Sequence, residues 1–370
     1  MSHLAQLIEI SRYYGRNPAY VIAGGGNTSF KDRDRIYVKA SGISLAGIDE
    51  SGFVVLSRAL LGEMEERLYP EDASSRELAV KQDLKKAVLG SGHLRPSVET
   101  SLHNLIDYPF VVHTHPTWIN ALMCAVDAEK ETRERFGADA LYVAYTDPGF
   151  VLFKKLQEEI RAWQAERGES PKIIFLQNHG IFVAGNSTAE IRALYTSLES
   201  RIWEGKSRQL PDDALSARDT RLSKFIQNYY RERGLQAMAL SSELSRYYCR
   251  DKSRMEQVAR PFTPDQIVYC KSNYLFLPGT IAEKACGDEL AAFEKRRGHY
   301  PRLILEEGGA LIVVEENVRG LQIVAAVFSD AMKLSYLSAQ FGGPHSMTGD
   351  QIAFIDNWEV ENYRRKIAKA

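Results

Sequence analysis

The sequence lacks the features that mark membrane, secreted or nucleic-acid-binding proteins. No apolar run reaches the ~18 residues that a membrane-spanning helix needs, and the polar, helix-patterned segment 1–16 does not resemble a signal peptide. The net charge is −1, which gives no reason to expect nucleic acid or an anionic membrane as a partner. Free thiols in a reducing cytoplasm are expected, because the cysteines lack CxxC spacing. They are Cys124, Cys249, Cys270 and Cys286.

Nucleotide-binding glycine motifs are missing as well. Gly24–Gly26 is not followed by the GK[ST] of a Walker A loop, and no GxGxxG fingerprint occurs. The composition, 44% apolar and 26% charged, is that of an ordinary globular protein. A length of 370 residues suggests two domains. We place the boundary in the charged segment 206–222, and therefore expect one domain over 1–208 and a C-terminal α/β domain over 209–370.

The first candidate site lies in Pro109–Pro116, which reads PFVVHTHP. The apolar residues before the histidines favour a buried strand. Because side chains alternate along a strand, His113 and His115 are expected on one face and Thr114 on the other. Pro116 cannot continue a central strand, so the strand should end where a site can open. Two neighbouring imidazoles suit a metal such as zinc, although a pair of structural histidines fits the same pattern.

A third candidate ligand lies in the segment KIIFLQNHGIFVAG, residues 172–185. Two apolar runs flank a polar turn, which predicts a hairpin of two buried strands. A histidine in such a turn has little packing value, so His179 is the best candidate for a third ligand. Three histidines with an open position are typical of a catalytic zinc site rather than a structural one.

One carboxylate is a candidate acid/base. Residues 95–106 read as a helix that begins near Pro96 and Ser97, with Glu99 in its first turn. Glu99 either stabilises the helix dipole or takes part in chemistry, depending on its distance from His113. His103 lies one turn further, and we expect a structural role for it.

Two loops have the residues of an anion site. Three glycines in Gly24–Gly26 allow backbone N–H groups to approach an anion, and Asn27 follows with further side-chain hydrogen bonders. After the next strand, Ser41 and Gly42 offer a hydroxyl and an N–H close to Lys39. Plain turns are the alternative in both places.

The remaining elements follow from periodicity and capping signals. Helices are expected over 4–14, 74–89 (with Ser74 and Glu77 as a capping box), 117–125, 150–166, from Ser187 to about 205, and 318–340. Strands are expected over 20–22, 36–39, 53–56 and 141–145.

The second half contains a possible copy of the hairpin. LEEGGALIVV, residues 305–314, aligns without gaps on LQNHGIFVAG, residues 176–185, and places Gly308 opposite His179. In both places a strand, a glycine-containing turn, a strand and a helix follow one another. We infer a degenerate second copy that has lost the metal site.

Five motifs together resemble one family, the class II aldolase/adducin family, over about residues 4–205. The motifs are GGGNTS (24–29), VKASG (38–42), RPSVE (95–99), HTHP (113–116) and QNHG (177–180). This family includes fuculose-1-phosphate and rhamnulose-1-phosphate aldolases and ribulose-5-phosphate 4-epimerases. Three segments are most similar to the aldolase part of bifunctional rhamnulose-1-phosphate aldolase/dehydrogenase proteins. They are RPSVETSLH (95–103), HTHP (113–116) and RPFTPD (260–265). No nucleotide-binding motif follows, so we do not expect their dehydrogenase part here.

The resemblance implies a fold and a set of site residues. The fold is three-layered α/β/α with a central, mainly antiparallel sheet, in a homotetramer with active sites at subunit interfaces, and the cysteine pattern already favours the cytoplasm. The implied metal is Zn²⁺ or another divalent ion such as Mn²⁺, bound by three histidines, with Glu99 as catalytic acid/base. The implied ligands are His113, His115 and His179, and the implied phosphate-binding residues are Asn27, Ser41, Gly42 and Ser97.

The implied reaction is retro-aldol cleavage of a ketose, in particular a ketose 1-phosphate, to dihydroxyacetone phosphate and an aldehyde. One departure concerns phosphate, because many relatives have a serine where this chain has Val98. Tyr142 and Tyr145 are options for the family's proton-donating tyrosine, and neither is assigned. The alternatives are a 4-epimerase, dehydratase or decarboxylase on the same metal, or a non-catalytic adducin-like interaction module.

Overall fold

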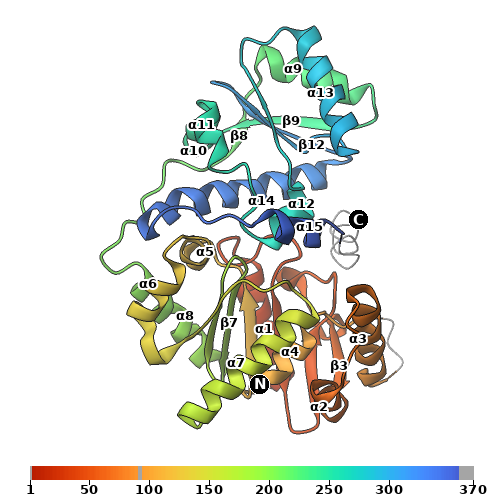
Figure 1. The fold of residues 1–370 in the computed structure, drawn as a ribbon, viewed down its shortest axis with the longest axis vertical. Helices are drawn as coiled ribbons and strands as arrows, with labels where there is room; N and C mark the ends of the chain where they lie inside the picture. The colour runs from red at the N-terminus through yellow and green to blue at the C-terminus, as the bar shows by residue number, and fades with distance from the viewer. Residues whose placement is uncertain (1, 91–93, 358–370) are drawn as a thin grey trace. The chain divides into compact units, whose positions relative to one another are not determined.

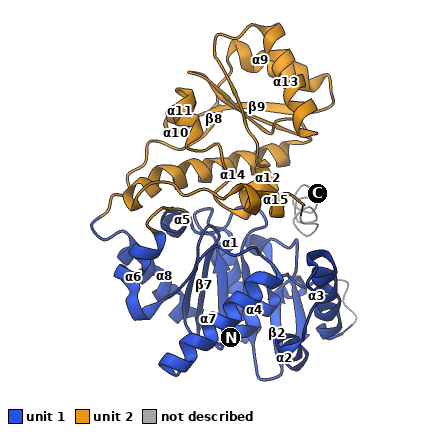
Figure 2. Ribbon diagram, viewed as in Figure 1, with its two compact units in different colours: residues 1–123, 128–205 blue, residues 124–127, 206–370 orange. Residues whose placement is uncertain are grey.

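The computed structural model describes residues 2–90 and 94–357 (Figure 1). Residues 1, 91–93 and 358–370 lie outside the description, including the last part of the expected C-terminal domain. The chain forms two compact units (Figure 2). Unit 1 comprises residues 1–123 and 128–205, and unit 2 comprises residues 124–127 and 206–370. Among the described residues, no helix combines the length and apolar character needed to cross a bilayer.

A seven-stranded sheet forms the centre of unit 1. Its strand order is β3-β2-β1-β4-β7-β6-β5, and every neighbouring pair is antiparallel except β5 and β6. The expectation of a central, mainly antiparallel sheet is therefore confirmed. The strands are β1 (Asn27–Lys31), β2 (Arg35–Lys39), β3 (Phe53–Ser57), β4 (Phe110–Thr114), β5 (Leu141–Val143), β6 (Ile173–Leu176) and β7 (Gly180–Gly185).

Helices cover both faces of this sheet, which confirms the three layers. Side chains of α4 and α7 share an apolar core with β4–β7, while α1 and α8 pack against the opposite face (Figure 1). The helices are α1 (His3–Gly15), α2 (Arg58–Glu66), α3 (Ala73–Ala87), α4 (Thr100–Leu105), α5 (Thr117–Met123), α6 (Ala128–Phe136), α7 (Phe150–Arg167) and α8 (Thr188–Ile202). Short 3₁₀ turns occur at Leu45–Gly47, Glu50–Gly52 and Gly137–Asp139.

The strand expected at residues 20–22 is wrong. The N–H groups of Tyr20 and Val21 both donate to the carbonyl of Asn17, which closes a turn. Val21 is still buried, so its apolar character reflects packing of a turn rather than a strand. The strand β1 begins only after the glycines, at Asn27. It is not an edge strand, because β2 and β4 pair with its two sides.

Three helix and strand boundaries also differ from expectation. The N-cap of α3 is Asp72 rather than Ser74, and the Glu77 carboxylate instead accepts the N–H of Phe150. The helix expected over 95–106 begins at Thr100, because the preceding segment makes its own hydrogen bonds. The strand expected over 141–145 ends at Val143.

Unit 2 repeats five strands of unit 1. Its strand order, β10-β11-β12-β9-β8, has one parallel pair, β10 and β11, followed by antiparallel pairs. In unit 1, the strands β5-β6-β7-β4-β1 follow the same pattern, with one parallel pair, β5 and β6, followed by antiparallel pairs. The strands are β8 (Ser216–Ala217), β9 (Gln236–Ser241), β10 (Leu275–Leu277), β11 (Leu303–Glu306) and β12 (Leu311–Glu315).

The helices of unit 2 also follow the pattern of unit 1. α13 joins the parallel strands as α7 does, and α14 follows the hairpin as α8 does. α9 and α13 share a core with the sheet, and α14 packs against β12 and β9. The helices are α9 (Arg221–Arg231), α10 (Glu243–Cys249), α11 (Lys252–Glu256), α12 (Pro264–Cys270), α13 (Glu283–Arg297), α14 (Val318–Leu337) and α15 (Gly349–Asn357), with a 3₁₀ turn at Ser338–Phe341.

Hydrogen bonds fix the register between the two copies of the hairpin. The N–H of Asn178 donates to the carbonyl of Met123 at the end of α5 (3.1 Å), and the N–H of Gly308 donates to the carbonyl of Cys249 at the end of α10 (2.8 Å). Asn178 and Gly308 also share a positive φ, 54° and 66°. Gly308 therefore corresponds to Asn178, and Gly309 corresponds to His179. The sequence alignment, which paired Gly308 with His179, was displaced by one residue.

The two copies also share an ion pair, although its carboxylate comes from different positions. Lys172 pairs with Glu190 of α8 at 2.8 Å, and the corresponding Arg302 pairs with Glu315 of β12 at 3.1 Å. In each copy a glycine faces the carboxylate. A Cβ on Gly185 would lie 2.9 Å from Glu190 Oε2, and a Cβ on Gly320 would lie 3.2 Å from Glu315 Cβ. The list of equivalences is Lys172 with Arg302, Gly185 with Glu315, and Glu190 with Gly320.

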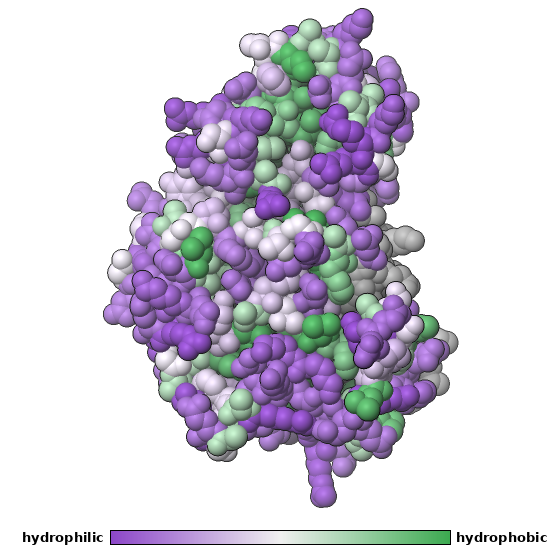
Figure 3. Space-filling model, in the orientation of Figure 1, coloured by the Kyte–Doolittle hydropathy of each residue, from purple (hydrophilic) through white to green (hydrophobic). Residues whose placement is uncertain are grey.

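The visible face of the molecule is mostly hydrophilic, with apolar residues in patches between polar ones (Figure 3). Large apolar side chains that are exposed include Leu68, at 96%, and Leu78, at 55%. Individual exposed apolar residues are normal for a folded protein.

Candidate metal centre

The first two candidate ligands lie at the end of β4, the central strand of the unit 1 sheet. β1 and β7 pair with its two edges, and His113 lies opposite Asn27 on one side and Phe182 on the other. The expected alternation is observed. The Thr114 hydroxyl faces α8, 2.6 Å from the Tyr195 hydroxyl, whereas the His113 ring stacks on Phe182 with centroids 4.2 Å apart.

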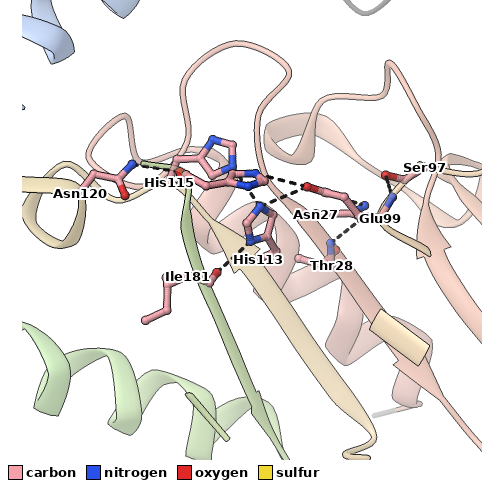
Figure 4. Close-up of polar contacts among 9 residues, drawn as sticks. Asn27, Thr28, Ser97, Glu99, His113, His115, Asn120 and Ile181 are labelled. Carbon is pink, nitrogen blue, oxygen red and sulfur yellow. Dashed lines mark hydrogen bonds and ion pairs between the residues drawn. The ribbon is translucent and has the colours of Figure 1, made fainter. Parts of the chain in front are cut away.

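His115 lies one residue beyond the end of β4 and points toward His113. Its N–H donates to the carbonyl of Tyr20 at 3.1 Å, so the turn before β1 holds this residue in place. The Nε2 atoms of His115 and His113 are 3.0 Å apart, and Figure 4 shows the two rings converging. Gly180 makes room for this ring, since a Cβ there would lie 2.7 Å from His115 Cδ2.

The β6–β7 turn brings His179 to the same place. Its ring centroid lies 5.0 Å from that of His113 and 5.2 Å from that of His115. Turns usually lie at the solvent-exposed surface, but this one is buried, with Asn178 at 1% and His179 at 8% exposure. The His179 carbonyl accepts a hydrogen bond from the Asn120 side chain on α5 at 3.2 Å.

The donor set fits a divalent metal such as zinc. His113, His115 and His179 each offer one ring nitrogen, and these three atoms lie within 4.8 Å of one another. His113 Nδ1 lies 3.0 Å from the Ile181 carbonyl, which is a hydrogen-bond acceptor, so Nδ1 donates to it and Nε2 is the nitrogen that faces the centre. Such hydrogen bonds to the second nitrogen are the usual support of a metal-bound histidine. Neutral imidazoles around one point are typical zinc ligands.

The Glu99 carboxylate faces this centre. Glu99 Oε1 lies 3.3 Å from His113 Nε2 and 3.7 Å from His179 Nε2, while Oε2 accepts a hydrogen bond from Asn27 Nδ2 at 3.3 Å (Figure 4). Burial acts to raise the pKa of Glu99, but the imidazoles, His113 above all, hold that pKa well below its usual range. Glu99 is therefore a carboxylate adjacent to the three rings, at the N-cap position of α4.

The candidate phosphate residues are joined to Glu99 through the chain before α4. Ser97 Oγ accepts the N–H of Glu99 at 3.2 Å, and the N–H of Ser41 donates to the Arg95 carbonyl at 2.9 Å. Gly42 has a φ of 83°, which glycine adopts without strain. The structure thus connects both loops to the segment that leads to Glu99, and it places Asn27 in direct contact with the carboxylate.

His103 is buried behind this cluster, in agreement with a structural role. Its Nδ1 lies 2.8 Å from Ser29 Oγ, and its carbonyl accepts a hydrogen bond from Lys31 Nζ at 2.7 Å. Burial lowers the pKa of His103 to about 3 and, with a contribution from Arg58, the pKa of Lys31 to about 7.

Sequence reasoning missed several residues that support the site. Asn120 donates to a backbone carbonyl, Ile181 acts through its own carbonyl, and Tyr195 is far from the site in sequence. None of them belongs to a recognisable motif. Of the two tyrosines considered, Tyr145 contacts the β6–β7 turn, because its N–H donates to the Gln177 side chain at 3.0 Å. Its hydroxyl donates to Asp147 at 3.1 Å.

Comparison with known proteins identifies the family. The model of the class II aldolase and adducin N-terminal domain matches residues 5–202. A Bacillus subtilis (strain 168) protein described as the uncharacterized oxidoreductase YuxG is 27% identical over 192 residues, which are 50% of this chain but only 26% of that relative.

Solved structures match a similar share of this chain. An N-terminal class II aldolase domain from Thermoplasma acidophilum is 27% identical and matches 55% of this chain and 93% of its own, with a TM-score of 0.47. An L-fuculose-1-phosphate aldolase from Thermus thermophilus is 17% identical and matches 55% and 99%, with a TM-score of 0.33. The family model spans more than half of the chain, and the chain belongs to the class II aldolase/adducin family.

Proposed function

We propose that this protein is a metal-dependent aldolase that cleaves a ketose, in particular a ketose 1-phosphate, to dihydroxyacetone phosphate and an aldehyde. The observation that carries the proposal is the convergence of three imidazole nitrogens with a carboxylate at one strand end. An interaction module needs no such convergence. Family membership supports the same chemistry.

In this proposal, His113, His115 and His179 hold the metal, with Zn²⁺ or Mn²⁺ as candidates. When bound, a divalent cation acts as a Lewis acid toward a carbonyl substrate and stabilises negative charge that develops as the carbon–carbon bond breaks. The Ile181 carbonyl fixes the His113 ring so that Nε2 faces the metal position. His179 is held instead through its backbone, in the buried β6–β7 turn.

Glu99 carries the proton in this proposal. Cleavage requires a base for the hydroxyl proton of the carbon that becomes the aldehyde, and the reverse reaction requires a base for a carbon proton. Asn27 Nδ2 holds one carboxylate oxygen while the other faces the imidazoles. A base positioned in this way contributes roughly 10²–10⁴-fold to the rate.

The substrate phosphate is assigned to Asn27, Ser41, Gly42 and Ser97. Two of these, Ser41 and Gly42, lie in a partly exposed turn after β2, where a backbone N–H and a hydroxyl suit a phosphate oxygen. Val98 offers no hydroxyl beside Ser97, so fewer donors are available than in many phosphate-cleaving relatives. We therefore expect weaker affinity for phosphate, and a screen must include unphosphorylated ketoses.

A screen of ketose 1-phosphates and free ketoses tests the proposal. The purified protein, loaded with Zn²⁺ or Mn²⁺, is incubated with each compound, and aldehyde release is measured by a coupled reductase assay. We expect release from at least one compound and its loss on addition of a chelator. Formation of an epimer without aldehyde would replace the proposal with an epimerase. Absence of metal from the protein and of any turnover would refute an enzymatic role.

A further inference from the structure

The repeated fold provides an internal comparison for the metal centre. Hydrogen bonds that occur at equivalent places in both units belong to the shared architecture, whereas bonds found only beside the three histidines are candidates for a role in metal binding. α5 and α10 occupy equivalent places, each directly after the strand that pairs with the hairpin. Both helices accept a backbone N–H from the hairpin turn at their last residue, Met123 or Cys249. That bond is architectural.

The Asn120 bond is different. Asn120 lies three residues before Met123, is 1% exposed, and donates from Nδ2 to the His179 carbonyl at 3.2 Å. The equivalent residue of α10, three before Cys249, is Arg246. Its guanidinium lies 3.5 Å from Ser241 Oγ rather than at the turn. The turn of unit 2 therefore keeps its shape without a side-chain donor from this helix, and the donor occurs only where the turn carries a histidine.

The other end of the Asn120 amide supports the same conclusion. Asn120 Oδ1 is buried and has no hydrogen-bond partner among the described residues. Of the two ends of the side-chain amide, only Nδ2 therefore has a partner among the described residues, and that partner is the His179 carbonyl.

We propose that Asn120 is a positioning residue for the metal centre, which fixes the backbone of His179 so that its ring meets those of His113 and His115. This inference rests on the proposed metal site. Removal of the donor leaves in place the backbone bonds from the Asn178 N–H to Met123 and from the His179 N–H to Leu176, and it removes the side-chain bond to the His179 carbonyl. Loss of such supporting bonds typically costs 10–100-fold in metal affinity.

The test compares Asn120→Leu, which keeps the branching and number of side-chain heavy atoms but has no donor, with Arg246→Leu at the equivalent place in unit 2. Zinc affinity is measured by competition with a chromophoric chelator, and the visible spectrum of the Co²⁺-loaded protein reports ligand geometry. We expect Asn120→Leu to bind zinc roughly 10–100-fold more weakly, with an altered Co²⁺ spectrum, and Arg246→Leu to match the wild type. Thermal unfolding of the metal-free proteins serves to separate metal binding from stability.

The outcomes distinguish the two levels of the argument. Wild-type affinity and spectrum in Asn120→Leu would overturn the role of Asn120 while leaving the metal site intact. Failure of the wild-type protein itself to bind Zn²⁺ or Co²⁺ would overturn the proposed function and this inference together. If Asn120→Leu does not fold, Asn120→Ala, which removes the donor without adding bulk or charge, gives the same comparison.

Discussion

Gly309 holds in unit 2 the backbone position that His179 holds in unit 1. A Cβ on Gly309 would lie 2.2 Å from Glu306 Cδ, so the Glu306 side chain fills the space that a side chain at position 309 would need. Glu306 accepts a hydrogen bond from the Thr220 hydroxyl at 2.7 Å. Where unit 1 has an imidazole, unit 2 therefore has a buried carboxylate that is held by its own partner.

The strand registers show that the other two ligand positions also lack histidine in unit 2. The equivalents of His113 and His115 on β9 are Ala239 and Ser241. We expect one zinc per chain rather than two, because all three ligand positions of unit 2 lack imidazole. Metal analysis after dialysis against zinc-containing buffer measures this ratio.

His179→Ala should abolish this zinc, because two imidazoles do not complete the site. His299→Ala is the matched control in unit 2, where His299 Nδ1 lies 2.9 Å from the Tyr300 carbonyl, and it should retain one zinc. Stoichiometric zinc in His179→Ala would refute the assignment of the three ligands.

Glu99→Gln should retain zinc and lose turnover. The amide keeps the volume of the carboxylate but cannot accept a proton, so we expect a rate loss of roughly 10²–10⁴-fold. Zinc content and turnover on the substrate found in the screen are measured together. Glu77→Gln removes a carboxylate that accepts the N–H of Phe150, and this variant should keep its turnover. An active Glu99→Gln would exclude Glu99 as the base.

Much of unit 1 could be predicted from the sequence, because its signals are local. The alternation around His113 and the apolar runs beside His179 specify strands through side-chain periodicity. Segment 20–22 has the same apolar character, yet Val21 packs inside a turn whose shape depends on hydrogen bonds to Asn17. Composition cannot distinguish these two cases.

The register of the repeat could not be predicted for a related reason. An apolar strand aligns almost equally well after a shift by one residue, and the correct pairing of Gly308 with Asn178 depends on φ angles and on bonds to distant helix ends. The role of Asn120 is likewise absent from any motif, since it acts on a backbone carbonyl 59 residues away in sequence.

The stability of the protein should depend on pH through Lys31. Its folded-state pKa is lowered to about 7 by burial, whereas an unfolded lysine titrates near 10.4. Between these values the unfolded chain binds a proton that the folded protein does not, so stability rises with pH. The slope from one such group is at most about 1.4 kcal/mol per pH unit.

Urea denaturation at several values between about pH 7 and 8.5, within the window set by these two pKa values, measures this slope, and Lys31→Met is the comparison. The variant loses the hydrogen bond to the His103 carbonyl and should be less dependent on pH over this range. Equal slopes in the two proteins would show that Lys31 does not titrate as expected.

The carboxylate of the ion pair lies on the helix in unit 1 (Glu190) and on the strand in unit 2 (Glu315). This difference predicts that substitutions at positions 185 and 190 affect stability in a non-additive way. Glu190 Oε2 accepts the N–H of Asn186, and Glu315 Oε2 accepts the N–H of Glu316, so the carboxylate reaches the equivalent backbone group from two different positions. In unit 1, Gly185→Glu alone places a second side chain against Glu190, and we expect a loss of roughly 1–3 kcal/mol from overpacking. Glu190→Gly alone removes a partly exposed ion pair worth about 0–1 kcal/mol and adds a helical glycine that costs roughly 0.5–1 kcal/mol.

The double variant recreates the arrangement of unit 2, with the carboxylate on the strand and the glycine on the helix. Because the new carboxylate can occupy the space that Glu190 vacates and reach Lys172, we expect the double variant to be more stable than the sum of the single changes, by about 0.5–3 kcal/mol. Chemical denaturation of the four proteins gives this coupling energy. Additive effects would mean that the two ion pairs are not equivalent and would remove this support for the correspondence between the two hairpins.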